Sequence, residues 1–597
     1  MGTKTKRSGA RLSAYFRARD RGRVLALLAA VCALYLPFLG NPLVFDDVPL
    51  FSGGFLDYYA HAPFKLEFRW FHFASMGWTA RVFSDLFPQP FRLGNLLLHA
   101  ANAIVLFHVL RQLLAAVLRE QADAINVKLA QRVLAVPLAH RERGNGGEGN
   151  GHGESPPRIL EQRFIMTITW GAWLGALIFA LHPLAVYATG YVAERSILLA
   201  TLFVLLAQWA YLRALLSGQA KWLPLALLAF FIACFSKEHS VTLPAVLAAM
   251  TLLLRRENRL SRPALAAVWC AFTAIALLVV LIARGKLVQV LGTAYEPMAV
   301  ESFAQQDIVA GGAMLHLLSV LTQAGLFFKY LLLWALPNPA WMSIDMREPF
   351  VASLSAWQGW LGAAGFALYG AVAVRLLLSG GMKGLAGLAL LYPWLLFFTE
   401  FSTVRVQEPF VLYRSYLWMP GLMLLIPLLL LRFPQRKTLL LSGCVVVLLI
   451  PLALNRLWVF GDNYRLWNDA ALLLQNERVA GADRIYYNRG QALLAQQKWA
   501  EAARDFERSA AISPQLAPIH YMLGMAYVNA GRYQEALQQF DATLAINADD
   551  DRAYFAKGFT LKRMHRDREA MQQMEQSCRL KNQSACLLVS MSQSNKH

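Results

Sequence analysis

The chain has 597 residues, of which 57% are hydrophobic and only 16% are charged. Soluble domains carry about a quarter of charged residues, so this composition excludes an ordinary soluble protein and predicts an all-α, polytopic membrane protein. The net charge is +20, but the basic residues lie in short loops beside apolar runs. This distribution is typical of membrane orientation and excludes the continuous basic tract expected of a nucleic-acid-binding protein.

The N-terminal segment predicts an uncleaved first membrane helix. A basic stretch, residues 1–23, precedes the apolar "VLALLAAVCALYLPFLG", and no small-residue cleavage site follows it. Further apolar runs approach the length of about 20 residues that a membrane helix needs. The eleven candidates cover residues 24–40, 92–115, 165–181, 196–215, 221–236, 239–254, 264–283, 356–377, 384–400, 415–431 and 438–459.

Lys and Arg in the short loops predict the orientation of these helices. The N-terminus and alternate loops are basic and should be cytoplasmic, and an odd number of spans then places the C-terminus on the outer side. Residues 144–157, which are Gly-rich and polar, should form a disordered cytoplasmic loop. Residues 308–337 are also apolar enough to cross, which would make twelve spans and bring the C-terminus inside. We expect this segment to lie in or dip into the outer interface.

After residue 460 the composition turns polar, which divides the chain into a membrane domain, 1–460, and a C-terminal domain, 461–597. Internal repeats appear in the second domain. Small residues recur every 34 positions, and a large apolar residue recurs in the same phase. This is the tetratricopeptide pattern, and it predicts an α-solenoid over 482–583 whose concave surface binds a protein. The three sets are Gly490, Gly524 and Gly558, then Ala502, Ala536 and Ala570, then Phe506, Phe540 and Met574.

Cys578 and Cys586 follow the repeats at a separation of eight residues. Two helical turns is too far for a disulfide within one straight helix, but the two thiols can meet across a helix–turn–helix. A disulfide is permitted if this domain faces an oxidising compartment. Two buried free thiols are the alternative, and the sequence leaves both open.

Polar residues gather at the outer ends of several predicted helices, where they could converge. Ionisable side chains at membrane depth are costly and are functional candidates by default. Simpler interpretations also apply: an Asp pair in a turn, a snorkelling Arg, a Lys–Glu pair between chain neighbours, or a His-Pro that ends a helix. The candidates are Asp46 and Asp47 after the first run, then Arg69, His182, Glu194, Arg195, Lys237, Glu238, Arg405, Glu408, Arg414 and Tyr416.

Taken in order, these motifs resemble the membrane-embedded glycosyltransferases of the GT-C class, which use polyprenyl-phosphate-linked sugars. The resemblance is closest to the transmembrane-and-tetratricopeptide O-mannosyltransferases and to bacterial relatives that decorate proteins such as pilins. It covers nearly the whole chain: the acidic pair, H-P and E-R around the fourth span, K-E before the sixth, E…R-x-Y before the tenth, and the repeats. Two positions depart from the family, Tyr187 in place of a glutamate and Arg69-Trp70 in place of Arg-Pro. These departures leave the sugar and the acceptor open.

The resemblance implies roles for the candidate residues. Asp46 would be the general base, with Asp47 as the second choice. Arg195, Lys237 and Arg414 would bind the donor phosphate. The substrate-binding residues would be Arg69, His182, Glu194, Glu238, Arg405, Glu408 and Tyr416.

The implied reaction moves a sugar, with inversion, from the lipid donor to a Ser or Thr hydroxyl of an exported protein. The enzyme would lie in a bacterial inner membrane, with the N-terminus cytoplasmic and the repeats periplasmic. The lipid-linked sugar is the only co-substrate implied, and the sequence shows no metal-ligand spacing. The alternatives are a transporter, a non-catalytic scaffold with a protein-binding tail, and a transferase whose acceptor is a lipid or glycan.

Overall fold

The computed structural model describes residues 21–45, 47–51, 54–83, 87–134, 156–292, 312–406, 408–430 and 435–594. Over these residues the chain is helical and forms no strand, apart from an isolated bridge between Met346 and Phe410. The prediction of an all-α protein is therefore confirmed. The predicted loop 144–157 and the candidate base Asp46 lie outside the described residues.

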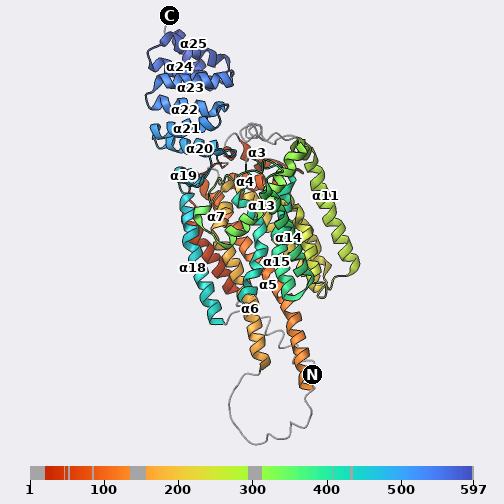
Figure 1. The fold of residues 1–597 in the computed structure, drawn as a ribbon. Helices are drawn as coiled ribbons and strands as arrows, with labels where there is room; N and C mark the ends of the chain where they lie inside the picture. Colours follow the sequence, from red (N-terminus) through yellow and green to blue (C-terminus); the bar gives the residue numbers. More distant parts are fainter. Residues whose placement is uncertain are drawn as a thin grey trace.

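Residues 21–459 form a bundle of helices, and the C-terminal helices project from one end of it (Figure 1). The first helix is described from residue 21 onward and runs into η1 (Leu36–Phe38). The helices that follow are α2 (Asp47–Leu50), α3 (Phe55–His61), α4 (Trp70–Val82), α5 (Pro88–Leu134), α6 (Pro156–Leu181), α7 (Pro183–Thr189), η3 (Val192–Glu194), α8 (Arg195–Ser217), α9 (Leu223–Ser236), η5 (Glu238–Thr242), α10 (Leu243–Leu253), α11 (Arg262–Gly292), α13 (Gly312–Ala335), α14 (Trp357–Leu378), α15 (Gly381–Phe397), η7 (Phe398–Ser402), η8 (Leu412–Arg414), α16 (Ser415–Trp418), η9 (Met419–Leu424), α17 (Leu425–Leu430) and α18 (Gln435–Val459).

Within the described part of the chain, nine helical segments are long and apolar enough to cross a membrane. A tenth is the pair α6 and α7, which is bent by 62°. The bend has a local cause, because a proline at position 183 cannot continue the hydrogen-bond ladder of α6. The predicted runs 221–236 and 239–254 correspond to Ala220–Ser236 and Glu238–Leu253, which are apolar but shorter.

The bundle has a buried centre and an apolar periphery. In the most apolar window of Val192–Ser217, which contains α8, 72% of the residues are buried, whereas the corresponding share is 17% in α11 and 22% in α14. Leu281 on α11 and Leu361 on α14 are each 62% exposed. Apolar side chains that face outward along whole helices are expected where lipid is the solvent, so the pattern agrees with the composition.

Helix α13 lies across the end of the bundle that carries the C-terminal helices. Its first half packs Leu315 in a cluster with Ala480, and its last turn stacks Trp334 on His182 at the end of α6, with ring centroids 4.2 Å apart. Between these contacts it runs beside residues 403–415, whose backbone it bonds at several points. Its length and hydropathy would allow a crossing, but both of its ends contact the same end of the bundle. Whether it crosses a membrane or lies at the interface stays a prediction.

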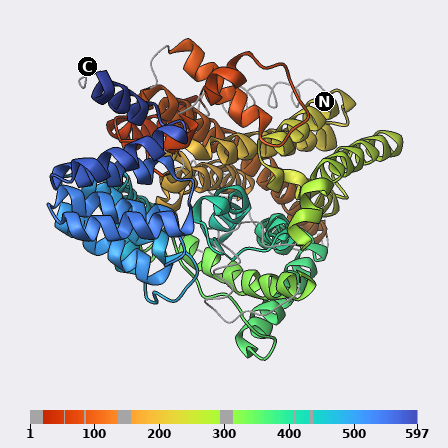
Figure 2. The same cartoon turned by 90° about the horizontal axis from the view of Figure 1, so that it is seen from above.

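The C-terminal helices, here called the repeat domain, form a stack of antiparallel pairs that lies over one side of the bundle (Figures 1 and 2). The close approach within each pair follows from the small residues at the 34-residue spacing. A Cβ added at Gly490 would lie 2.9 Å from Phe506, and one added at Gly524 would lie 2.6 Å from Phe540. The helices are α19 (Asn463–Leu473), α20 (Ala482–Ala495), α21 (Trp499–Ile512), α22 (Ala517–Asn529), α23 (Tyr533–Ile546), α24 (Asp551–Arg563), α25 (Asp567–Arg579) and α26 (Gln583–Ser594).

Cys578 and Cys586 form a disulfide, with their Cα atoms 4.6 Å apart. The bond joins the end of α25 to the start of α26, and the turn between the two helices brings the thiols together. Of the two alternatives left open by the sequence, the structure has the bonded pair. The other cysteines, Cys32, Cys234, Cys270 and Cys444, are free.

Candidate functional site

The acidic pair follows a strained residue at the repeat-domain end of the bundle. Phe45 has φ +47°, a left-handed conformation that side chains other than glycine rarely adopt. Its ring packs edge-on against Trp467 of α19, with centroids 5.3 Å apart, and lies 6.4 Å from the ring of Tyr191. The surrounding structure therefore holds the backbone that leads into the pair in a conformation it would not adopt alone.

The carboxylate of Asp47 is buried and bonded to backbone. One oxygen accepts a hydrogen bond from Val44 N at 3.1 Å, and the other accepts one from Ala193 N at 2.7 Å. Burial raises the pKa of Asp47 to about 7, while the charge of Arg92 and these N–H groups act in the opposite direction. Asp47 thus ties the start of α2 to η3. With both oxygens engaged, it is a positioning group here, and Asp46 keeps the role of candidate base.

Arg195 is buried, and its guanidinium donates to neutral groups of the bundle. Nε lies 2.9 Å from Asn95 Oδ1, Nη1 lies 2.8 Å from Thr79 Oγ1, and Nη2 lies 2.8 Å from Phe91 O. Nη1 also donates to Ser75 O at 2.9 Å. These bonds join α4, α5 and α8, so the geometry gives Arg195 a structural task that competes with the predicted role in phosphate binding.

Two ion pairs meet at the break between α9 and α10. Lys237 Nζ lies 3.4 Å from Glu194 Oε2 and 3.3 Å from Ser196 Oγ. Arg69 Nη2 lies 2.7 Å from Glu238 Oε1. Sequence reasoning considered a pair between the chain neighbours Lys237 and Glu238, but Lys237 pairs with Glu194 and Glu238 pairs with Arg69. The Lys237–Glu194 pair is buried, whereas the other pair is about two-fifths exposed and lies on the open side of the site.

Glu400 is the centre of a second charged group that sequence reasoning missed. It is fully buried in η7, the short helix that follows α15, and three basic side chains surround it. Arg405 Nε lies 2.7 Å from Oε2, Arg414 Nη1 lies 3.3 Å from the same oxygen, and His239 Nε2 lies 2.9 Å from Oε1. A carboxylate inside an otherwise apolar run, "WLLFFTEF", was the signal that could have revealed it.

A third group links this cluster to the repeat domain. Glu408 Oε2 lies 3.7 Å from Arg414 Nη2, and Glu408 Oε1 lies 2.7 Å from Arg484 Nη2 on α20. Arg484 Nε also lies 3.0 Å from Asp345 Oδ2, and Arg347 Nη2 lies 2.6 Å from the same oxygen. No sequence motif pointed to Asp345, Arg347 or Arg484, because they pair only through the fold.

The groups form one site. Lys237 Nζ lies 5.5 Å from the centre of the Tyr413 ring, and that ring lies 6.2 Å from the ring of Tyr191, which in turn contacts Phe45. The acidic segment, Lys237 and the residue preceding Arg414 are thereby joined by aromatic contacts. Among the described residues, no three His, Cys, Asp or Glu side chains come together in a way that could hold a metal ion.

Two predicted substrate-binding residues make internal contacts. His182 Nδ1 accepts a hydrogen bond from Leu184 N and so caps α7, and its Nε2 lies 3.2 Å from Trp334 O. The hydroxyl of Tyr416 lies 2.7 Å from Nδ1 of the buried His99. Both side chains are buried, so their observed contacts are internal to the bundle.

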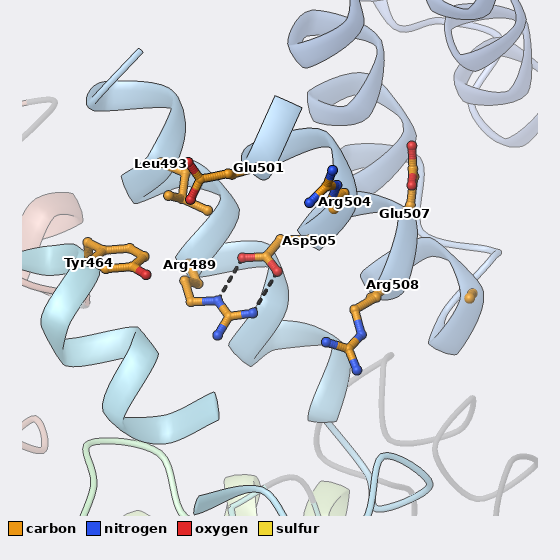
Figure 3. Close-up of a pocket in the computed structure, with 9 residues that line it drawn as sticks. Tyr464, Arg489, Leu493, Glu501, Arg504, Asp505, Glu507 and Arg508 are labelled. Atoms are coloured by element: carbon orange, nitrogen blue, oxygen red, sulfur yellow. Dashed lines mark hydrogen bonds and ion pairs between the residues drawn. The ribbon is translucent and has the colours of Figure 1, made fainter. Parts of the chain in front are cut away.

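A groove of about 630 Å³ lies where α19 meets α20 and α21. Its floor is crossed by a two-pronged ion pair, in which Arg489 Nε and Nη2 each lie 2.7 Å from the carboxylate of Asp505 (Figure 3). Arg504, Glu507 and Arg508 are exposed along its side. The lining residues are Tyr464, Arg489, Leu493, Glu501, Arg504, Asp505, Glu507, Arg508 and Ala511.

The repeat domain can be assigned by comparison. Residues 493–557 match the tetratricopeptide repeat family. Two solved structures are similar to the chain, and both are described as crystal structures of MamA. One is 20% identical, with 25% of this chain and 81% of that chain covered and a TM-score of 0.19. The other is 22% identical, with 20% and 67% covered and a TM-score of 0.18. No curated protein matches the chain.

The match confirms the tetratricopeptide interpretation of the repeats and lies within the predicted range, 482–583. Tetratricopeptide stacks generally bind proteins, so a protein partner agrees with this assignment. The interpretation of the helical bundle and its charged site comes from the residues and their geometry.

Proposed function

We propose that the chain is a membrane-embedded glycosyltransferase that moves a sugar from a polyprenyl-phosphate donor to a Ser or Thr hydroxyl of an exported protein. One observation carries the proposal. Lys237, Arg405 and Arg414 gather with their carboxylate partners at one end of an apolar bundle, beside the segment that carries the acidic pair. The tetratricopeptide repeats project from the same end.

Catalysis of this transfer needs a base for the acceptor. A Ser or Thr hydroxyl is a weak nucleophile at neutral pH, and a carboxylate within hydrogen-bond reach can remove its proton during attack. In the proposed mechanism Asp46 takes that proton while the hydroxyl oxygen bonds to the anomeric carbon. Asp47 holds the loop in place through Val44 and Ala193. A single displacement of this kind inverts the anomeric centre.

The leaving group needs fixed positive charge. As the bond between the anomeric carbon and the phosphate oxygen breaks, negative charge grows on the lipid phosphate, and preorganised cations stabilise it. We assign this role to Lys237 and Arg414, with Arg405 beside them. Arginine suits the task because its planar fork donates two parallel hydrogen bonds to phosphate oxygens. The partly exposed pair of Arg69 and Glu238 lies on the open side, where a sugar would bind.

The proposed location is a bacterial inner membrane, with the N-terminus in the cytoplasm and the repeats in the periplasm. The basic loops support this orientation, and the Cys578–Cys586 disulfide supports an oxidising compartment for the repeats. Protease treatment of intact spheroplasts tests it. The repeats should be cleaved without lysis, and cleavage only after lysis would reverse the topology.

The repeats would hold the acceptor protein close to the site and so raise its effective concentration. Mass spectrometry of exported proteins from a deletion strain would identify this acceptor through the loss of its glycan. If the exported proteins of the deletion strain keep every glycan, the acceptor would instead be a lipid or a glycan.

The direct test uses the purified full chain in lipid nanodiscs. Synthetic polyprenyl-phosphate hexoses and pentoses are supplied with Ser and Thr peptides, and transfer is followed by mass spectrometry. One donor should give an O-linked product with wild type and none with Asp46→Asn. A folded chain that neither transfers any of these sugars nor binds a polyprenyl phosphate would favour a transporter or a scaffold.

A further inference from the structure

Arg484 is the point at which the repeat domain reaches into the candidate site. It lies in the first turn of α20, and it contacts Glu408 at 2.7 Å and Asp345 at 3.0 Å. Both carboxylates belong to loops of the helical bundle. Asp345 already has Arg347 as a second partner at 2.6 Å, whereas the second partner of Glu408 is Arg414, at 3.7 Å.

Glu408 is therefore shared between a repeat-domain arginine and a candidate phosphate-binding arginine. Burial alone would raise the pKa of Glu408, but the charges of Arg484 and Arg414 outweigh it and hold the pKa at about 2. The carboxylate is ionised at neutral pH, and its shorter contact is with Arg484. If that partner were lost, the positive charges that still act on Glu408 would be those of Arg414 and Arg347.

A second contact of Arg484 reaches the acidic segment. Its guanidinium carbon lies 4.8 Å from the centre of the Phe45 ring, a geometry in which a cation is attracted to the ring face. Phe45 is the residue with φ +47° that immediately precedes the acidic pair. Trp467 of the repeat domain packs on the same ring. One arginine thus touches both the phosphate-binding side and the base side of the site.

We propose that Arg484 is a positioning residue that draws Glu408 away from Arg414, so that Nη2 of Arg414, whose Nη1 pairs with Glu400, can bind the donor phosphate. The inference rests on the proposed glycosyl transfer. A carboxylate and a phosphate compete for the same guanidinium donors, and Arg484 weakens the competition from Glu408, which lies 3.7 Å from Nη2 of Arg414. The first repeat helix is then part of the enzyme's site, and the repeats are more than an attached acceptor-binding module.

The test measures the affinity of the full chain in nanodiscs for a synthetic polyprenyl phosphate. Arg484→Gln should bind it about tenfold more weakly, because Glu408 turns to Arg414. The double variant Arg484→Gln/Glu408→Gln should regain affinity to within about threefold of wild type. If Arg484 only docked the repeat domain on the bundle, removing the charge of Glu408 as well would not restore the affinity for polyprenyl phosphate. Arg484→Lys should be intermediate, since an ammonium cannot make both carboxylate contacts in fork geometry.

A matched control lies five residues further along α20. Arg489→Gln breaks an ion pair with Asp505 inside the repeats, so it reports the general effect of disturbing this helix. Its affinity for polyprenyl phosphate should match that of wild type. If Arg484→Gln does not fold, the single variant Glu408→Gln provides the test. It should bind polyprenyl phosphate at least as tightly as wild type.

The inference would be overturned by equal binding of folded Arg484→Gln and wild type, by no recovery in the folded double variant, or by weaker binding of Glu408→Gln. An equal loss in Arg484→Gln and Arg489→Gln would do the same, because it would trace the effect to the stability of the repeats. Wild type that binds no polyprenyl phosphate overturns the proposed function, and this inference with it.

Discussion

Lys237 pairs with Glu194 and not with Glu238, its neighbour in the chain. Its Nζ lies 3.4 Å from Glu194 Oε2, and the two side chains are only 4% and 9% exposed. Glu238 turns instead to Arg69, 2.7 Å away. Ion pairs therefore connect the break between α9 and α10 to two separate parts of the bundle. Lys237 lies in a buried position, where its charge needs a partner.

The Lys237–Glu194 pair should show the behaviour of a buried ion pair. Lys237→Met leaves Glu194 buried and uncompensated, which should destabilise the chain by about 3–5 kcal/mol. Lys237→Met/Glu194→Gln should regain most of that stability, because no charge is left without a partner. Donor binding should be lost in both variants. Thermal melts in detergent and binding of a polyprenyl phosphate check this, and a double variant no more stable than the single one would contradict it.

Substitution of Asp46 should affect the transfer rate, whereas substitution of Asp47 should affect stability. Asp46→Asn should fold normally and lose at least about a hundredfold in transfer rate, the usual minimum for a general base. Asp47→Asn should lose stability, because an amide NH₂ would face one of the two backbone N–H donors of Val44 and Ala193. A near-normal rate in Asp46→Asn, with a stable but inactive Asp47→Asn, would move the base to Asp47. Activity in both variants would refute the mechanism.

Asp47 should also give the fold a measurable pH dependence. Its pKa is about 7 in the folded chain, raised by burial from an ordinary value of 3.8. A raised carboxyl pKa favours the protonated form, so its contribution to stability is complete below about pH 4 and is lost as the pH rises through 7. Within that window the slope is about 1.4 kcal/mol per pH unit. Melting temperatures of wild type should therefore fall more steeply from pH 5 to 8 than those of Asp47→Asn, and parallel curves would contradict this.

The architecture was largely predictable because its signals are local. The 34-residue spacing of Gly490, Gly524 and Gly558 identifies paired helices whose close packing the structure shows. Hydropathy located the apolar helices to within a few residues. The order of the motifs also predicted that the candidate residues converge, and contacts between several of them agree with this. These features depend on residues that are close in sequence, or on the fact that successive loops lie at alternate ends of the bundle.

The partners within the site were not predictable, because pairing depends on the fold. Glu400 binds His239, 161 residues earlier in the chain, and no spacing rule connects them. Arg195 occupies a motif position typical of a ligand, but folding surrounds it with acceptors from α4 and α5. Arg484 lies in a repeat whose pattern fixes only packing positions, so its reach to Glu408 has no local signature.

Substitutions of Arg414 and Arg195 should affect different properties, the first donor affinity and the second stability. Arg414→Lys should weaken binding of a polyprenyl phosphate by about tenfold or more, since a point charge cannot replace a two-pronged contact. Arg195→Lys should instead lower the melting temperature and change affinity little, because Arg195 donates to Asn95, Thr79 and Phe91. Affinities and melts of both variants provide the measurement. Loss of affinity in a fully stable Arg195→Lys would restore it as a phosphate ligand.

The groove between α19 and the first repeat should bind the acceptor protein. Deleting residues 482–597 is not a clean test, because Arg484 is removed as well and transfer to a short peptide should also fall. Arg504→Glu/Arg508→Glu reverses two exposed charges beside the groove and leaves the membrane-domain contacts intact. It should raise the KM for the folded acceptor about tenfold, while transfer to a short Ser or Thr peptide stays unchanged. Arg566→Gln, which removes an exposed ion pair with Glu569 elsewhere in the repeats, is the control and should resemble wild type with both acceptors. Equal kinetics of the charge-reversed variant and wild type on the folded acceptor would show that the groove does not hold it.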